Sequence, residues 1–167
     1  MSCLGVLFSL GADEVKKLKD IKTDQDRLNY LQEEVEQNYF DQYPQRLAEL
    51  DKSWDALHRS LTDGKLEYNN GNFPLSHVIL GGEILYAEDD YIMVLKTPEQ
   101  VKQIAHAVNI TGKAFLDKGY QQIDAAEYGF PLTDEDLEYT WLWFDGTKEF
   151  WKLAAEENRY VLFTADQ

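Results

Sequence analysis

Residues 50–64 carry titratable side chains at a spacing that could support chemistry. A helix here, turning by about 100° per residue, would place four large apolar residues on one stripe: Leu50, Trp54, Leu57 and Leu61. A second stripe, about a quarter-turn away, would be polar and consist of Asp51, Asp55, His58 and Thr62. The sequence therefore predicts a histidine at the edge of a buried face, with carboxylates on its own side of the helix.

His58 is the first candidate for a catalytic residue. Asp51 or Asp55 would orient its imidazole as a general base, and Ser76 or Asp63 would supply a second reacting group. The alternative is structural, because most polar groups at a core edge simply satisfy one another. We favour this alternative. The chain has no His-x-x-x-His pair and a single cysteine, so no metal site is predicted.

A second group of candidates lies further along the chain, between a proline and a glycine pair. Ser76 precedes His77 there, but the Gly-x-Ser-x-Gly pattern of a nucleophile elbow is missing. The backbone amides of Gly81 and Gly82 could approach a ligand, and the side chains of Trp54 and His77 are the other candidates for ligand binding. A glycine pair after a short helix is more typical of a C-cap and turn, which is the interpretation we prefer.

Aromatic and acidic side chains are concentrated toward the end of the sequence. Six aromatic residues could line a ligand groove: Tyr139, Trp141, Trp143, Phe144, Phe150 and Trp151. Rings at helical spacing more often pack in a core. Residues 124–157 also hold ten acids and two bases, which is −8 of the total charge of −15. Such a run is usually a solvated surface, and its functional alternative is an acidic face that meets a basic partner.

Composition excludes several classes of function. Sixteen basic residues against 31 acidic ones give the net charge of −15, which repels phosphate backbones and anionic lipids. We therefore predict neither nucleic-acid nor membrane binding. The apolar residues 1–10 follow no positive charge and precede Asp13-Glu14, which favours a first strand over a secretion signal. Cys3 is the only cysteine, which fits a reducing, cytoplasmic location. No cofactor fingerprint is present, so no cofactor is predicted.

The pattern of apolar residues and end signals predicts an α+β fold. The clearest helix start is Thr97-Pro98-Glu99-Gln100, with a capping threonine, an early proline and a glutamine at the third helical position. Helices are expected at 11–19, 24–40, 97–109, 111–118 and 134–157, and the helical pattern of residues 50–64 extends back through Leu47. Strands are expected at 4–9, 83–87, 91–95 and 160–164. We predict a single compact domain over residues 1–167: several helices cover a small mixed sheet, and a long C-terminal helix, which Asp145-Gly146 can divide, precedes a final strand.

Residues 50–58, together with Leu61-Thr62, resemble the signature of the YfbM-like family of bacterial proteins of unknown function. The order of the remaining segments is similar to that family over essentially the whole chain, including Pro74-Leu75-Ser76, Leu80-Gly81 and Thr97-Pro98. The resemblance implies a single compact α+β domain. It implies no activity, since no reaction or catalytic residue is established for the family.

Two classes of function are consistent with these patterns. The first is a non-catalytic binding or interaction module, a small acidic cytoplasmic protein that docks a partner with a basic surface. The second is a small hydrolase or transferase that uses His58 as its general base. A cleft that exposes His58 beside a second polar group would support the enzyme, and a sealed histidine would support the module. We favour the module, because no complete catalytic set is present.

Overall fold

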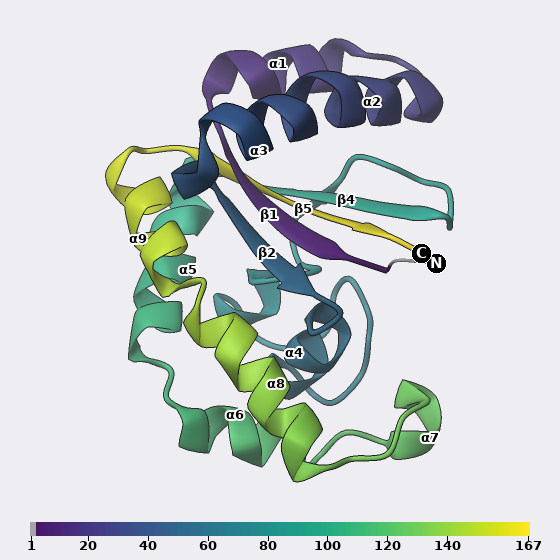
Figure 1. Ribbon diagram of the computed structural model, residues 1–167, viewed down its shortest axis with the longest axis vertical. Helices are drawn as coiled ribbons and strands as arrows, with labels where there is room; N and C mark the ends of the chain where they lie inside the picture. Colours follow the sequence, from purple (N-terminus) through teal and green to yellow (C-terminus); the bar gives the residue numbers. More distant parts are fainter. Residues whose placement is uncertain (1–2) are drawn as a thin grey trace.

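A computed structural model describes residues 3–167 (Figure 1). Its sheet has the strand order β2-β1-β5-β4-β3. The strands are β1 (Gly5–Leu10), β2 (Leu47–Asp51), β3 (Glu83–Ile84), β4 (Tyr91–Lys96) and β5 (Tyr160–Asp166). The predicted α+β fold with a final strand is confirmed. The sheet is antiparallel throughout rather than mixed, because every pair of neighbouring strands runs in opposite directions.

Helical segments cover both faces of this sheet (Figure 1). The first face is covered by α1 (Ala12–Asp20), α2 (Asp24–Tyr30), the π-helical η1 (Leu31–Glu36) and α3 (Gln37–Gln42). The second face is covered by α4 (Trp54–Leu61), α5 (Pro98–Ile110), α6 (Lys113–Tyr120), α8 (Asp134–Asp145) and α9 (Lys148–Glu156). Short segments complete the connections: the 3-10 turns η2 (Pro44–Arg46) and η3 (Leu75–His77), and α7 (Ala125–Tyr128). No helix within residues 3–167 has the length and apolar character needed to cross a membrane.

The sheet separates two hydrophobic clusters, one beneath each helical layer. Side chains of a strand alternate between faces, so Phe8 packs with the α1–α3 layer and its neighbour Leu7 packs with the α4–α9 layer. The same alternation in β4 sends Val94 to the second face and places Lys96, which is 0% exposed, against the same core. A lysine therefore occupies a position at which the strand pattern favours an apolar residue.

Local signals identified several elements correctly. The capping box at the start of α5 is present: Gln100 N donates to Thr97 Oγ1 at 3.3 Å, and Thr97 N donates to Gln100 Oε1 at 3.0 Å. The predicted stretch 134–157 is divided at Gly146 into α8 and α9. The predicted hairpin is present, with Glu83 opposite Leu95.

The prediction of a continuous helix from Leu47 into the Trp54 segment is wrong. Leu47–Asp51 forms the edge strand β2, because it pairs with β1 from Gly5 to Phe8. A β-bulge interrupts this pairing near Gly5, and Asp51 adopts a positive φ of 50° that ends the strand. Helix α4 consequently begins only at Trp54.

Candidate functional site

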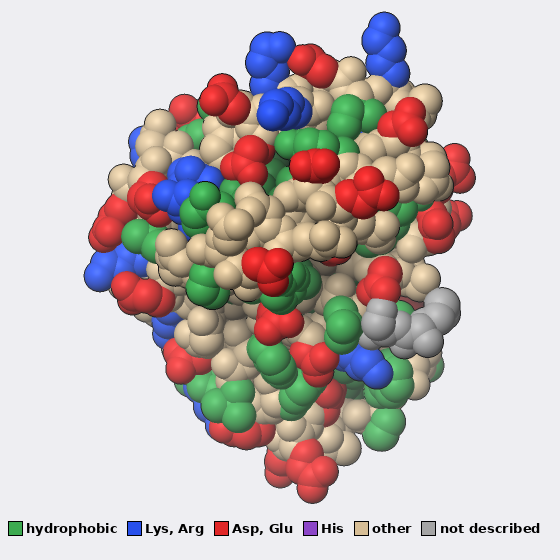
Figure 2. Space-filling view, turned by 45° about the horizontal axis from the view of Figure 1, so that its top comes forward, with side chains coloured by type: hydrophobic (Ala, Val, Ile, Leu, Met, Phe, Trp, Pro, Cys, Tyr) green, Lys and Arg blue, Asp and Glu red, His purple; other side chains and the backbone are tan. Residues whose placement is uncertain are grey.

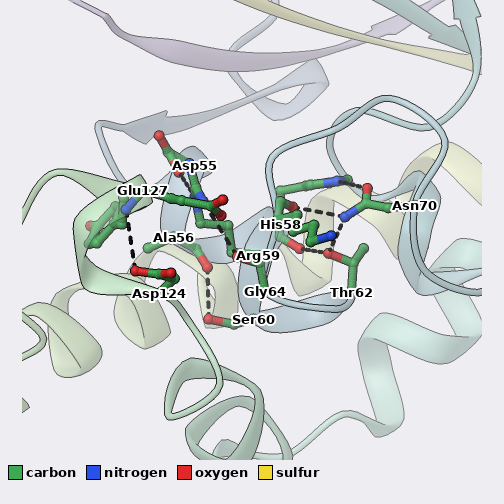
Figure 3. Close-up of polar contacts among 12 residues, drawn as sticks. Asp55, Ala56, His58, Arg59, Ser60, Thr62, Gly64, Asn70, Asp124 and Glu127 are labelled. Carbon is green, nitrogen blue, oxygen red and sulfur yellow. Dashed lines mark hydrogen bonds and ion pairs between the residues drawn. The ribbon is translucent and has the colours of Figure 1, made fainter.

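His58 lies sealed beneath the loop that follows α4 and is 1% exposed (Figure 3). Its Nε2 atom is 2.8 Å from Oδ1 of Asn70. The Nδ2 group of Asn70 donates to Asp63 Oδ1 at 2.6 Å and to the Lys65 carbonyl at 2.8 Å, with Thr62 Oγ1 at 3.2 Å. Because Nδ2 is the donor of this amide, Oδ1 must accept, and Nε2 of His58 carries the proton. His58 thus fastens the loop to the helix.

The predicted carboxylate partners of His58 lie elsewhere, which corrects the expectation from helical spacing. Asp55 accepts a hydrogen bond from Arg59 Nε at 2.6 Å, on the other side of α4 in Figure 3. Asp51 is in β2, not in the helix, and accepts a hydrogen bond from the Tyr139 hydroxyl. An amide, not a carboxylate, therefore orients the imidazole.

Burial lowers the pKa of His58, and the hydrogen bond to Asn70 only partly opposes this effect. Because the folded-state pKa lies below the ordinary value of 6.5, the unfolded chain binds more protons as the pH falls below that value. The contribution of this neutral histidine to stability is therefore present above pH 6.5 and is lost as the pH falls through the folded-state pKa.

Replacing His58 with glutamine is expected to lower the free energy of unfolding by about 1–3 kcal/mol at pH 7.5, since the flexible glutamine side chain lacks the rigid imidazole ring that fills this buried site and holds its donor against the Asn70 oxygen. The variant should also lose less of its stability between pH 6.5 and pH 5 than the wild type does. Urea titrations at these three pH values measure both effects. Wild-type stability in His58→Gln at pH 7.5 would contradict the structural role.

The other predicted site residues are held by packing. Ser76 Oγ is 2.9 Å from Nδ1 of its neighbour His77, and the Ser76 carbonyl accepts a hydrogen bond from the backbone N–H of Gly81 at 3.0 Å. A Cβ atom on Gly81 would lie 2.5 Å from His77 Nδ1, and one on Gly82 would lie 2.4 Å from the Leu95 carbonyl. Both glycines are thus required by close backbone packing.

Trp54 is a core residue with 6% exposure. Its ring centroid is 5.7 Å from that of Phe163, and its indole Nε1 donates to the Cys3 carbonyl at 2.8 Å. Gly5 allows this approach, since a Cβ there would lie 2.8 Å from Trp54 Cδ1. The indole of Trp54 belongs to the hydrophobic cluster between the sheet and the α4–α9 layer.

A concave surface lies along β2, between the two helical layers. It consists of two hollows of about 270 and 530 Å³, which share Phe40, Glu49 and Trp143. The first hollow is lined by Leu4, Gly5, Val6, Gln32, Glu36, Phe40, Glu49, Asp51, Tyr91, Trp143, Thr164 and Asp166. The second is lined by Phe40, Pro44, Gln45, Leu47, Ala48, Glu49, Trp143, Gly146, Glu149, Phe150 and Leu153. We call the two hollows together the β2 groove.

The β2 groove combines aromatic surface with negative charge. Its carboxylates are Glu36, Glu49, Asp51, Glu149 and Asp166, and no lysine or arginine is among its lining residues. In Figure 2 the centre of the face shown carries acidic and hydrophobic side chains, and most lysines and arginines lie toward its margins. A groove of this kind is complementary to a ligand that is both cationic and apolar.

The electrostatics of the first hollow agree with this description. Burial, aided by the nearby charge of Asp166, raises the pKa of the Glu36 carboxyl. Within residues 3–167, neither Glu36 nor Glu49 forms an ion pair with a lysine or arginine. A cation placed here would therefore meet Glu36 and Glu49, which no lysine or arginine of the described residues already neutralises.

Sequence patterns anticipated this groove only in part. Of the six aromatic residues singled out near the end of the chain, Trp143 and Phe150 line the groove, whereas Phe144 and Trp151 are buried in the core. Of the acidic residues in 124–157, only Glu149 is among the lining residues. The other carboxylates come from η1, β2 and β5. In the described part of the chain, no three His, Cys, Asp or Glu residues form a cluster suited to a metal ion.

Comparisons with known proteins give a family and a fold. Residues 1–164 match the family described as a domain of unknown function (DUF1877). The crystal structure of YfbM from Escherichia coli, a protein of unknown function, is similar over 97% of this chain and 99% of that chain, with a TM-score of 0.66 and 18% sequence identity. A search of curated proteins finds no match. The chain therefore belongs to the DUF1877 family, which confirms its predicted YfbM-like membership.

Proposed function

We propose that this protein is a non-catalytic binding module that docks a basic segment of a partner protein in the β2 groove. The observation that carries the proposal is the groove itself: five carboxylates and several aromatic rings line its two adjoining hollows, and no lysine or arginine is among their lining residues in the described part of the chain. A cationic segment with apolar side chains would complement both properties. The charge of −15 adds long-range attraction for such a partner.

The sealed position of His58 supports a module rather than an enzyme. A general base must lie within hydrogen-bond reach of a substrate proton, but His58 is 1% exposed and its Nε2 atom is engaged by Asn70. Among residues 3–167, no histidine, cysteine or serine lines either hollow of the β2 groove. The groove therefore offers an aromatic surface and negative charge, and these properties suit the binding of a cationic partner.

A defined peptide tests the proposal. The probe is a fluorescein-labelled peptide of about ten residues, a strand length, that alternates lysine and valine. Fluorescence anisotropy at low ionic strength should show binding, and the affinity should fall as salt screens the groove carboxylates. A glutamate–valine peptide and duplex DNA should not bind, because the protein repels polyanions.

Two charge reversals separate the groove from the overall charge. Glu49→Lys, at the junction of the two hollows, is expected to weaken peptide binding by about tenfold or more, which is about 1.4 kcal/mol. Glu99→Lys makes the same change in net charge in the first turn of α5, outside the groove, and should stay within about twofold of wild type. Absence of wild-type binding, or equal losses in both variants, would overturn the proposal.

A further inference from the structure

We infer that the basic segment binds as an added β-strand, pairing its backbone with the outer edge of β2. This inference rests on the proposed function and specifies how the β2 groove holds its ligand. It concerns Leu47–Glu49, the regular part of β2 ahead of the bulge. The expected complex has a sixth strand beside β2.

The outer side of β2 has unpaired backbone groups. β2 is the edge of the sheet and pairs only with β1 on its inner side. Within residues 3–167, no group outside the sheet hydrogen-bonds to the backbone of Leu47, Ala48 or Glu49. An edge strand in this state is a template for a further strand.

The β2 groove has one wall on each side of β2, so each face of an added strand would contact one wall. The edge strand lines the second hollow of the groove through Leu47, Ala48 and Glu49. Phe40 of α3 stands on the side of the first helical layer, and Trp143 and Phe150 stand on the side of the second. Figure 1 shows β2 between α3 on one side and α8 on the other. Successive side chains of a bound strand would point alternately to these two walls.

Charge determines which occupant the edge favours. A second copy of this chain, pairing β2 with β2, would place two sets of groove carboxylates against each other, a like-charge arrangement that costs free energy. A basic segment instead supplies cations to Glu49 on β2 and to Glu36 and Glu149 on the flanking helices. The opposite edge strand, β3, spans only Glu83–Ile84, so its ladder is shorter than that of β2.

The test uses the lysine–valine probe in four forms. In a strand paired along one edge, alternate residues direct their N–H groups to the partner. Replacing an amide by an ester removes that N–H with little change in bulk. The four peptides carry no ester, esters at the lysine positions, esters at the valine positions, and esters at both. Strand addition predicts that at least one singly substituted peptide binds within about twofold of the parent, and that the doubly substituted peptide binds at least about tenfold more weakly.

Amide hydrogen exchange supplies a second readout on the protein. Bound parent peptide should slow exchange within Leu47–Glu49, and β3 serves as the internal control that should not change. Parent-like affinity of the doubly substituted peptide, or equal losses for both singly substituted peptides, would overturn strand addition and leave the proposed function intact. Failure of the parent peptide to bind would overturn the proposed function itself. A concentration-dependent dimer whose formation excludes the peptide would assign the edge to a second copy of the chain and also overturn the inference.

Discussion

Replacing Trp54 with alanine is expected to lower the free energy of unfolding by about 3–5 kcal/mol, as truncations of large buried aromatic residues do. The indole is 6% exposed, packs on Phe163 and donates its N–H to the Cys3 carbonyl. Gly5, which lies against the indole, has no side chain that could occupy the resulting cavity. Since whole domains hold about 5–15 kcal/mol, a urea titration should show a large shift of the midpoint or an unfolded variant.

Trp143→Ala provides the matched control. Trp143 is half-buried and lines both hollows of the β2 groove, so its loss should affect peptide binding more than stability. A Trp54→Ala protein as stable as Trp143→Ala would contradict the assignment of Trp54 to the core.

Replacing Lys96 with methionine is expected to change how stability depends on pH. Lys96 is fully buried, and its Nζ donates to the Ile79 carbonyl at 2.5 Å. Burial lowers its pKa well below the ordinary value of 10.5. Between the lowered pKa and 10.5 the unfolded chain binds the extra proton, so wild-type stability rises with pH by up to about 1.4 kcal/mol per unit. Lys96→Met removes this slope.

Urea titrations from pH 7 to pH 9.5 measure the difference between the two proteins. The stability of Lys96→Met relative to wild type should be greatest at the lowest pH and should decline steadily toward pH 10.5. Lys102→Met removes an exposed lysine of α5 and should follow the wild-type curve. Parallel curves for wild type and Lys96→Met would show that the buried amine is not the source of the pH dependence.

Elements defined by local chemistry were predictable from the sequence. The start of α5 rests on a capping exchange between Thr97 and Gln100, two residues three positions apart, and neither partner depends on the rest of the fold. The break at Gly146 has a similarly local cause. β2 was missed because Leu47, Leu50 and Trp54 also fit a helical spacing. Its strand conformation depends on pairing with Gly5–Phe8, about forty residues earlier.

The candidate site was less predictable for the same reason. Because Leu47–Asp51 is a strand, Asp51 does not lie on the helix face that carries His58. Helical spacing alone could not predict this separation. The partner of His58 is Asn70, a neutral amide in a turn-rich loop, whose sequence gives no sign of the contact. The β2 groove draws residues from η1, α3, β2, β5 and α8, which the chain brings together only through tertiary structure. The concentration of aromatic residues around Trp143 and Phe150 was the one usable signal.

The strand order has a consequence for how the chain folds. The strand at the centre of the sheet, β5, pairs with β1 on one side and β4 on the other, and Leu10 opposes Tyr160 across 150 positions of sequence. Until residues 160–166 are in place, nothing joins the β1–β2 pair to the β3–β4 pair, and β1 and β4 each expose the edge that β5 later covers. Sequence-distant pairing of this kind closes a very large loop, which slows folding and leaves partly folded chains open to aggregation. The sheet therefore cannot be assembled progressively in the order of synthesis, and shortened versions that lack β5 should behave as unfolded chains.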